Sequence, residues 1–308
     1  MMNKITKNSY DILTRLAECQ ILTASQLSAF NQRSRQVVRR NIRTLRQEDF
    51  ITSDEQGYGQ GKGRREKILS LTTKGAEFLR DEGILSDRAT FSAKNSSESI
   101  LFNHHLLVNW FHIHLIHMER VVSQLSVNFL SSNSLSLKEN NKLSLKERVR
   151  MESVLEGFIE FIPDAAFSIT CKDADIDKTL LFFLEVDMDT ETLASGKRNP
   201  KDLRQKIVNY QALFPSKRYK RYERFFGAKL NGFRLLFLAN TFARMTAICR
   251  LVQEMPSSDF IWVTDQERMF SHGLSSEIWA RGGKNDDPPQ SIIGSKLACD
   301  SPVIETIR

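Results

Sequence analysis

The segment SRQVVRRNIRTLRQ, residues 34–47, determines the fold expected for the beginning of the chain. Val38, Ile42 and Leu45 recur at the spacing of one helical face, and Ser34 can cap the helix. The other face is lined with arginine. Its members are Arg35, Arg39 and Arg43, with Arg33, Arg40 and Arg46 beside them. The pattern predicts an amphipathic helix with one buried stripe and one basic surface.

Two shorter helices are expected before this segment. Apolar residues recur at helical spacing within residues 10–19, and Thr23 can cap a second helix over residues 24–30. Three short helices with arginines on the third are typical of a helix-turn-helix, whose last helix enters the DNA major groove. The residues expected to contact base edges are Arg35, Gln36, Arg39 and Arg43.

A β-hairpin, or wing, is expected after the third helix. Residues 50–52 and 67–71 are β-prone and flank the glycine-rich segment GYGQGKG, residues 57–63, which can approach a DNA backbone closely. The basic residues placed there to contact phosphates are Lys62, Arg64, Arg65 and Lys67. With the closing segment LTTKGAEFL, this order resembles winged-helix repressor-type domains over residues 5–83.

The excess positive charge of the chain lies entirely in this region. Residues 1–80 contain 15 Lys and Arg against 8 Asp and Glu, whereas residues 81–308 contain 29 of each sign. Charge that serves solubility would be spread over the surface, whereas a phosphate-binding module concentrates it. The distribution favours binding of double-stranded DNA, and the alternative is a solvated basic face on an unrelated three-helix bundle.

Length and composition favour a soluble, cytoplasmic protein with two domains and no membrane partner. The 308 residues include no apolar run long enough to span a bilayer, and the first residues lack the apolar core of a signal peptide. Four widely spaced cysteines argue against a disulfide framework or a zinc site. The expected domains are a winged helix-turn-helix over 1–86, a linker over 87–99, an α/β domain over 100–270 and a disordered tail over 271–308.

The second domain is expected to begin with a long helix and to continue as a sheet. The helix, residues 100–122, contains five histidines, which we interpret as packing residues rather than metal ligands. The sequence LSLKE occurs twice within residues 131–147, and this short repeat indicates an exposed insertion. Strands are predicted at residues 157–162, 165–171, 179–186, 233–238 and 259–263, and helices at 201–214 and 242–254.

Three carboxylates are placed at the ends of these strands. Asp164 follows Pro163 at the start of one strand, and Glu185 and Asp187 share one face at the end of the buried strand LLFFLEVD. Neighbouring antiparallel strands would bring Asp164 beside this pair. Such carboxylates can bind Mg²⁺ or Mn²⁺, and a metal there can activate water for cleavage of a phosphodiester. The alternative is that these acidic residues simply end an exposed strand.

This acidic set resembles that of PD-(D/E)XK nucleases, with Pro163-Asp164 as the PD element and Glu185-Val186-Asp187 at the (D/E)XK position. The resemblance implies a restriction-endonuclease-like α/β domain. Asp187 stands where the family has lysine, and in some members that lysine comes from the following helix. Lys206, with Gln205 beside it, is the candidate here.

A broader resemblance covers residues 5–265. The phrases NHHLLVN (103–109), FIPDAAF (161–167) and FFLEVDMDTET (182–192) resemble the replication-relaxation family, whose members place a winged helix before a nuclease-like domain. The matching positions are His104, Asn109, Asp164, Glu185, Asp187, Thr190 and Glu191. Membership implies a role in replication, relaxation or mobilisation of plasmids or mobile elements, with replication or relaxation proteins as partners.

Three functions remain open from the sequence. The first is a DNA-binding accessory protein on a degenerate nuclease scaffold, and the second is a metal-dependent endonuclease that uses Asp164, Glu185, Asp187 and Lys206. The third is a transcriptional repressor whose second domain binds a ligand or dimerises, and a homodimer on a palindromic site is open for all three. The segment KRYKRYERFF, residues 217–226, either binds phosphates while stacking on bases or is a solvated insertion.

Overall fold

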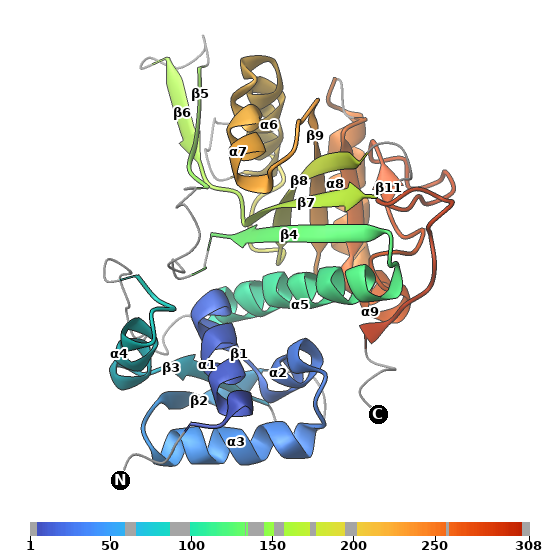
Figure 1. Cartoon of the computed structure of the whole chain (residues 1–308). Helices are drawn as coiled ribbons and strands as arrows, with labels where there is room; N and C mark the ends of the chain where they lie inside the picture. Colours follow the sequence, from blue (N-terminus) through green and yellow to red (C-terminus); the bar gives the residue numbers. More distant parts are fainter. Residues whose placement is uncertain are drawn as a thin grey trace. The chain divides into compact units, whose positions relative to one another are not determined.

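The computed structural model describes residues 5–58, 66–86, 99–132, 134, 145–150, 157–172, 177–194, 202–256 and 259–303. These residues form an α+β structure with several sheets (Figure 1). The chain divides into two compact units, the first ending at Ile113 and the second beginning at His114. This division falls inside a helix. Residues 87–98 of the expected linker and most of the expected insertion lie outside the described residues.

The first unit has the element order predicted for a winged helix. Its elements are α1 (Lys7–Cys19), β1 (Ile21–Leu22), α2 (Ala24–Asn31), α3 (Arg35–Gln47), β2 (Ile51–Tyr58), β3 (Glu66–Leu71) and α4 (Thr73–Asp81). Thr23 and Ser34 cap α2 and α3 through their side-chain oxygens, as expected. The two-residue strand β1, which was not predicted, pairs with β3.

Close packing fixes α4 against the start of the wing. Gly75 lies in the first turn of α4, where a Cβ atom would come within 2.1 Å of the carbonyl oxygen of Phe50. Thr72 caps α4 and donates its hydroxyl to the carbonyl of Asp49 at 2.6 Å. The sequence TTKG therefore allows this helix to sit directly on the chain that enters β2.

Helix α5 (Ser99–Val121) contributes its first part to the winged-helix unit. Phe102 and Leu106 form one apolar cluster with Ile21 and Ile68. Gln26 donates its amide to the carbonyl of Leu106 at 2.8 Å, and buried Asn109 donates to the carbonyl of Ile21 at 2.7 Å. The unit thus extends well beyond residue 86, because β1 and α2 obtain apolar and polar partners from α5.

The second unit is built on a six-stranded sheet with the order β11-β10-β9-β8-β7-β4. The strands are β4 (Leu125–Ser131), β7 (Ala165–Cys171), β8 (Lys178–Asp187), β9 (Phe233–Ala239), β10 (Ile261–Asp265) and β11 (Ala280–Arg281). Strands β8, β9 and β10 are parallel, and the other pairings are antiparallel. A separate hairpin pairs β5 (Glu147–Arg150) with β6 (Phe158–Phe161).

Strand β8 is buried on both faces, as its continuous apolar run predicts. Phe183 on one face belongs to the core cluster formed with α6 (Leu203–Ser216) and α8 (Phe242–Gln253), so both helices cover the same face. Phe182 on the other face stacks on Phe167 with ring centroids 4.8 Å apart. The predicted order of strands and helices between residues 165 and 265 is confirmed.

The prediction of a disordered tail from residue 271 is wrong for residues 271–303. Trp279 and Ile292 are buried, and the backbone of Trp279 pairs with Gln290. Gly273 packs against Ser301, whose carbonyl oxygen would lie 2.4 Å from a Cβ at residue 273. A few large side chains and serine hydrogen bonds hold this segment in place. Such isolated anchors produce no helical or strand periodicity, so the sequence pattern did not reveal the order.

No helix in the described part of the chain combines the length and the apolar character needed to cross a membrane. In the long helix α5, His114 is buried and the other four histidines are half-buried. His114 is 1% exposed and makes an edge contact with Phe270 of α9 (Gln266–His272), with ring centroids 5.4 Å apart. Both of its ring nitrogens are buried without a hydrogen-bond partner among the described residues.

We predict that His114 makes the protein sensitive to acid. Burial, with a smaller contribution from His117, lowers the pKa of His114 to about 3 from 6.5. The pKa of His114 is lower in the folded state than in the unfolded state, so His114 costs no stability above pH 6.5. As the pH falls from 6.5 toward 3, His114 is protonated in the unfolded state only, and the free energy of unfolding decreases. At pH 5 the loss should be about 2 kcal/mol. His114→Leu should remove this loss in urea unfolding at pH 7 and 5, and an unchanged pH dependence would contradict the prediction.

Candidate functional site

The surface of α3 is the first candidate site. Val38 and Leu45 are 2% exposed and anchor the helix in the core, whereas the predicted DNA-binding residues face outward. The exposed side chains are Arg33, Arg35, Gln36, Arg39, Arg40, Arg43 and Arg46. Among the described residues these arginines form no ion pair. The helix therefore presents a basic face that forms no ion pair with any carboxylate in the described part of the chain.

A groove of about 370 Å³ runs between α3 and the wing strands. Arg39 and Arg46 line it from α3, and Lys67 lines it from β3. Lys67 thus lies beside the basic face of α3. The other wing residues, Lys62, Arg64 and Arg65, lie outside the described residues.

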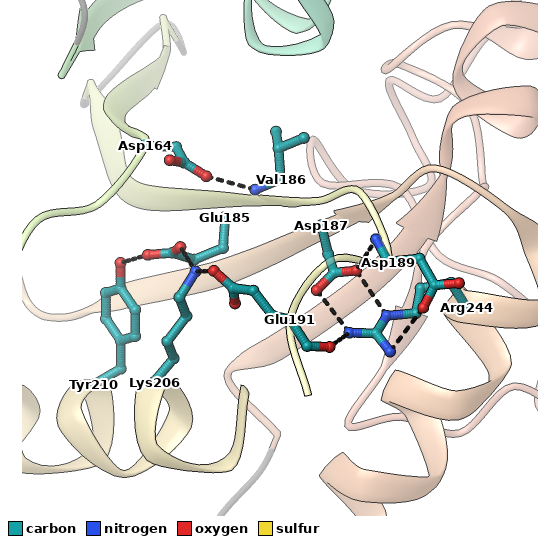
Figure 2. Close-up of polar contacts among 9 residues, drawn as sticks. All are labelled: Asp164, Glu185, Val186, Asp187, Asp189, Glu191, Lys206, Tyr210 and Arg244. Atoms are coloured by element: carbon teal, nitrogen blue, oxygen red, sulfur yellow. Dashed lines mark hydrogen bonds and ion pairs between the residues drawn. The ribbon is translucent and has the colours of Figure 1, made fainter. Parts of the chain in front are cut away.

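The carboxylates predicted for the second unit come from two adjacent strands. The register of β7 on β8 pairs Ala165 with Leu184, which brings Asp164 beside the end of β8. Asp164 Oδ2 accepts a hydrogen bond from the backbone N–H of Val186 at 2.8 Å. Figure 2 shows Glu185 and Asp187 on the same side of β8, as the alternation of a strand predicts.

Glu185 forms a compact cluster with two residues of α6. It is 3% exposed, and its Oε1 accepts from the Tyr210 hydroxyl at 2.6 Å while its Oε2 pairs with Lys206 Nζ at 3.0 Å. Lys206 also pairs with Glu191 at 2.9 Å. We call Asp164, Glu185, Glu191, Lys206 and Tyr210 the lysine cluster (Figure 2).

Burial determines the electrostatics of the lysine cluster. Burial, opposed by Lys206 and reinforced by the Asp164 carboxylate, raises the pKa of Glu185 to about 7. Burial also acts to lower the pKa of Lys206, but Glu185, Asp164 and Glu191 raise it above its ordinary value. Lys206 is therefore a permanent cation that stabilises the ionised form of Glu185.

Asp187 has a different cationic partner. Arg244, near the start of α8, donates its Nε to Asp187 Oδ1 at 2.7 Å and its Nη2 to Oδ2 at 3.0 Å. Asp189, in the turn after β8, pairs with Nη1 of Arg244 at 3.0 Å, and the carbonyl of Glu191 accepts from Nη2. The guanidinium thus holds both oxygens of Asp187 and the turn that follows it.

The predicted catalytic residues consequently fall into two groups. Asp164, Glu185 and Lys206 come together, whereas Asp187 is held by Arg244. Within the described ranges, no group of three His, Cys, Asp or Glu residues is arranged to hold a metal ion. The arrangement does not fit a divalent cation on all three predicted carboxylates, because Lys206, Tyr210 and Arg244 engage the oxygens of Glu185 and Asp187.

Two residues of this region received no role from the sequence. These residues are Tyr210 and Arg244. Arg244 lies 57 residues after Asp187, and only the parallel pairing of β8 with β9 brings α8 to this edge of the sheet. The spacing of Lys206 and Tyr210, four residues apart, puts both on one face of α6 and was the available signal for Tyr210.

A comparison with protein-family models found one match. The model described as Replication-relaxation matches residues 13–228, which cover most of the winged-helix unit and the strands that carry the lysine cluster. A search of the curated proteins found no match.

Solved structures match the chain over small parts. Lactococcus lactis ZitR in its apo form is 23% identical over 25% of this chain and 55% of its own, with a TM-score of 0.22. MepR from S. aureus is 20% identical over 39% and 80% with a TM-score of 0.23, and Bacillus subtilis PadR in complex with operator DNA is 19% identical over 37% and 71% with a TM-score of 0.22. The chain spans about half the length of the first solved structures it matches.

We predict that Asp187 and Arg244 are strongly coupled. Arg244→Met leaves a buried carboxylate without its cation and should lower the free energy of unfolding by about 3–5 kcal/mol. Asp187→Asn in addition should restore most of this loss, as measured by a double-mutant cycle in urea. The exposed pair of Arg204 and Glu254, 2.7 Å apart, is the matched control and should show a coupling below about 1 kcal/mol. Equal coupling in both cycles would contradict the assignment.

Proposed function

The chain belongs to the replication-relaxation family, and on this premise we propose that it binds duplex DNA through its winged helix and acts in replication, relaxation or mobilisation of a plasmid or mobile element. In this proposal α3 enters the major groove and the wing contacts the adjacent backbone. The proposed partners are double-stranded DNA and proteins of the same replication or relaxation process.

The observation that carries this proposal is the basic face of α3. Six arginines lie on or beside one short helix whose other face is fixed by buried Val38 and Leu45. Arginines without carboxylate partners remain available to phosphates and to the O6 and N7 atoms of guanine. Arg35, Gln36, Arg39 and Arg43 are the proposed base-contacting residues, and the remaining basic residues position the protein on the backbone.

We further propose that the second unit is a restriction-endonuclease-like scaffold that no longer needs to cut DNA for this role. Support comes from the antiparallel pair β7–β8, followed by α6 and the parallel strand β9, with Asp164 and Glu185 at adjacent strand ends. Lys206 and Arg244 already neutralise the buried carboxylates. The cluster then stabilises the fold without any bound ion.

The α3 proposal predicts a large loss of DNA binding in Arg39→Gln/Arg43→Gln. We expect at least a 10-fold weaker affinity for a duplex of about 60 base pairs, since each lost phosphate or base contact is worth about 1–3 kcal/mol. The matched control is Lys172→Gln/Lys284→Gln, which removes two exposed charges from the second unit. Fluorescence anisotropy measures both variants, and equal affinities for the α3 variant and the control would refute the proposal.

A metal-dependent endonuclease is the second candidate. One observation favours it: Asp164, Glu185 and Lys206, which resemble the PD-(D/E)XK set, meet at one place. The test is nicking of supercoiled plasmid with and without Mg²⁺ or Mn²⁺. We expect no nicking above the level of Asp164→Ala and Glu185→Gln. Relaxed product that requires metal and disappears in both variants would establish the endonuclease instead.

A further inference from the structure

The second unit has a basic surface of its own, between α6 and β9. Residues 217–229 contain six Lys and Arg and a single acidic residue. The rest of residues 81–308 contains 23 basic and 28 acidic residues, so the balanced total conceals a strongly uneven distribution. The segment forms the 3-10 helix η1 (Arg218–Tyr222) and the short helix α7 (Glu223–Phe226).

The aromatic side chains of this segment anchor it to the core. Tyr219 packs edge-on against Phe233 with ring centroids 5.6 Å apart, and Tyr222 packs edge-on against Phe183 at 5.5 Å. Phe226 stacks on Tyr222. Because all three rings are buried, they cannot stack on bases, and the alternative that the segment stacks on nucleic acid is wrong for these rings.

One basic residue turns inward with these rings. Arg221 pairs with the fully buried Glu147 of β5 at 2.8 Å, and the Tyr222 hydroxyl donates to the same carboxylate at 2.8 Å. Glu223, the only acidic residue of the segment, accepts from the backbone N–H of Leu230 at 2.9 Å. Both contacts hold the segment in place and leave its other charged residues directed to solvent.

Five basic side chains remain on the outside. They are Lys217, Arg218, Lys220, Arg224 and Lys229, all exposed and none in an ion pair with a described residue. Together they form what we call the η1 surface. The buried rings fix its backbone, so little conformational entropy is lost when a polyanion binds. Closely spaced cations repel one another, and a phosphate backbone relieves that repulsion while releasing its counterions.

We propose that the η1 surface is a second, sequence-independent binding surface for the phosphate backbone of duplex DNA. The inference rests on the proposed DNA binding and extends it from the first unit to the second. The winged helix would select the site, and the η1 surface would add affinity that falls steeply with salt.

The test compares three variants of the full chain on a random-sequence duplex of about 60 base pairs over a range of salt concentrations. The first is the η1 variant, Lys217→Gln/Arg218→Gln/Lys220→Gln/Arg224→Gln. The second is the matched control, Lys172→Gln/Arg250→Gln/Lys284→Gln/Lys296→Gln, which removes the same charge from exposed positions elsewhere on the second unit. The third is Arg39→Gln/Arg43→Gln. Thermal unfolding checks that all three remain folded.

We expect the η1 variant to bind at least 10-fold more weakly than the control near physiological salt. The magnitude of the slope of log affinity against log salt should fall by about 3.6, since each of the four lost phosphate contacts contributes about 0.9. If the η1 variant matches the control while the α3 variant loses binding, the η1 surface is refuted and the proposed function stands. If the η1 variant loses binding while the α3 variant does not, the winged-helix proposal fails and the η1 surface is upheld.

Discussion

The compensation of two buried carboxylates, Glu185 and Asp187, constrains where the helices of the second unit can lie. Both acids end the apolar strand β8, and an ionised carboxylate removed from water requires a cation or several hydrogen bonds close by. Lys206 and Tyr210 of α6 satisfy the first, and Arg244 of α8 satisfies the second. The two acidic residues at the end of β8 therefore fix the positions of both helices over the sheet. The rest of that sheet face is apolar, and apolar packing alone does not determine a position.

Positive charge occurs in two different arrangements in this chain. Lys206, which is half-buried, and Arg244, which is buried, are both paired with buried carboxylates, so they contribute to the fold. On α3 and on the η1 surface the cations are exposed and form no ion pair with any residue that the structure describes, and burial of the apolar residues beside them holds them in place. A nucleic acid can compete only for the second kind. This separation is the physical basis for proposing DNA contacts at these surfaces.

Much of the fold follows from periodicity, and much of the site does not. The helices of the first unit were predicted because their apolar residues recur with a period of about 3.6 residues. The strands between residues 165 and 265 were predicted because their apolar residues alternate with a period of 2 or form an unbroken apolar run. Strands β1 and β4 were missed because they are short or half-exposed, and the segment after residue 271 was missed because isolated side chains such as Trp279 anchor it. Asp164, Glu185 and Lys206 were found from residue types. The pairing of Asp187 with Arg244 depends on tertiary contacts over 57 residues, which no local pattern encodes.

The contribution of α5 to the winged-helix unit has a consequence for synthesis on the ribosome. Residues 5–81 are synthesised before Phe102, Leu106 and Asn109. Until then Ile21 and Ile68 lack their apolar partners, and the carbonyl of Ile21 lacks the Asn109 amide. During synthesis this module therefore exposes apolar side chains that α5 covers in the finished protein. The packing of this module is therefore completed only after the following helix has emerged.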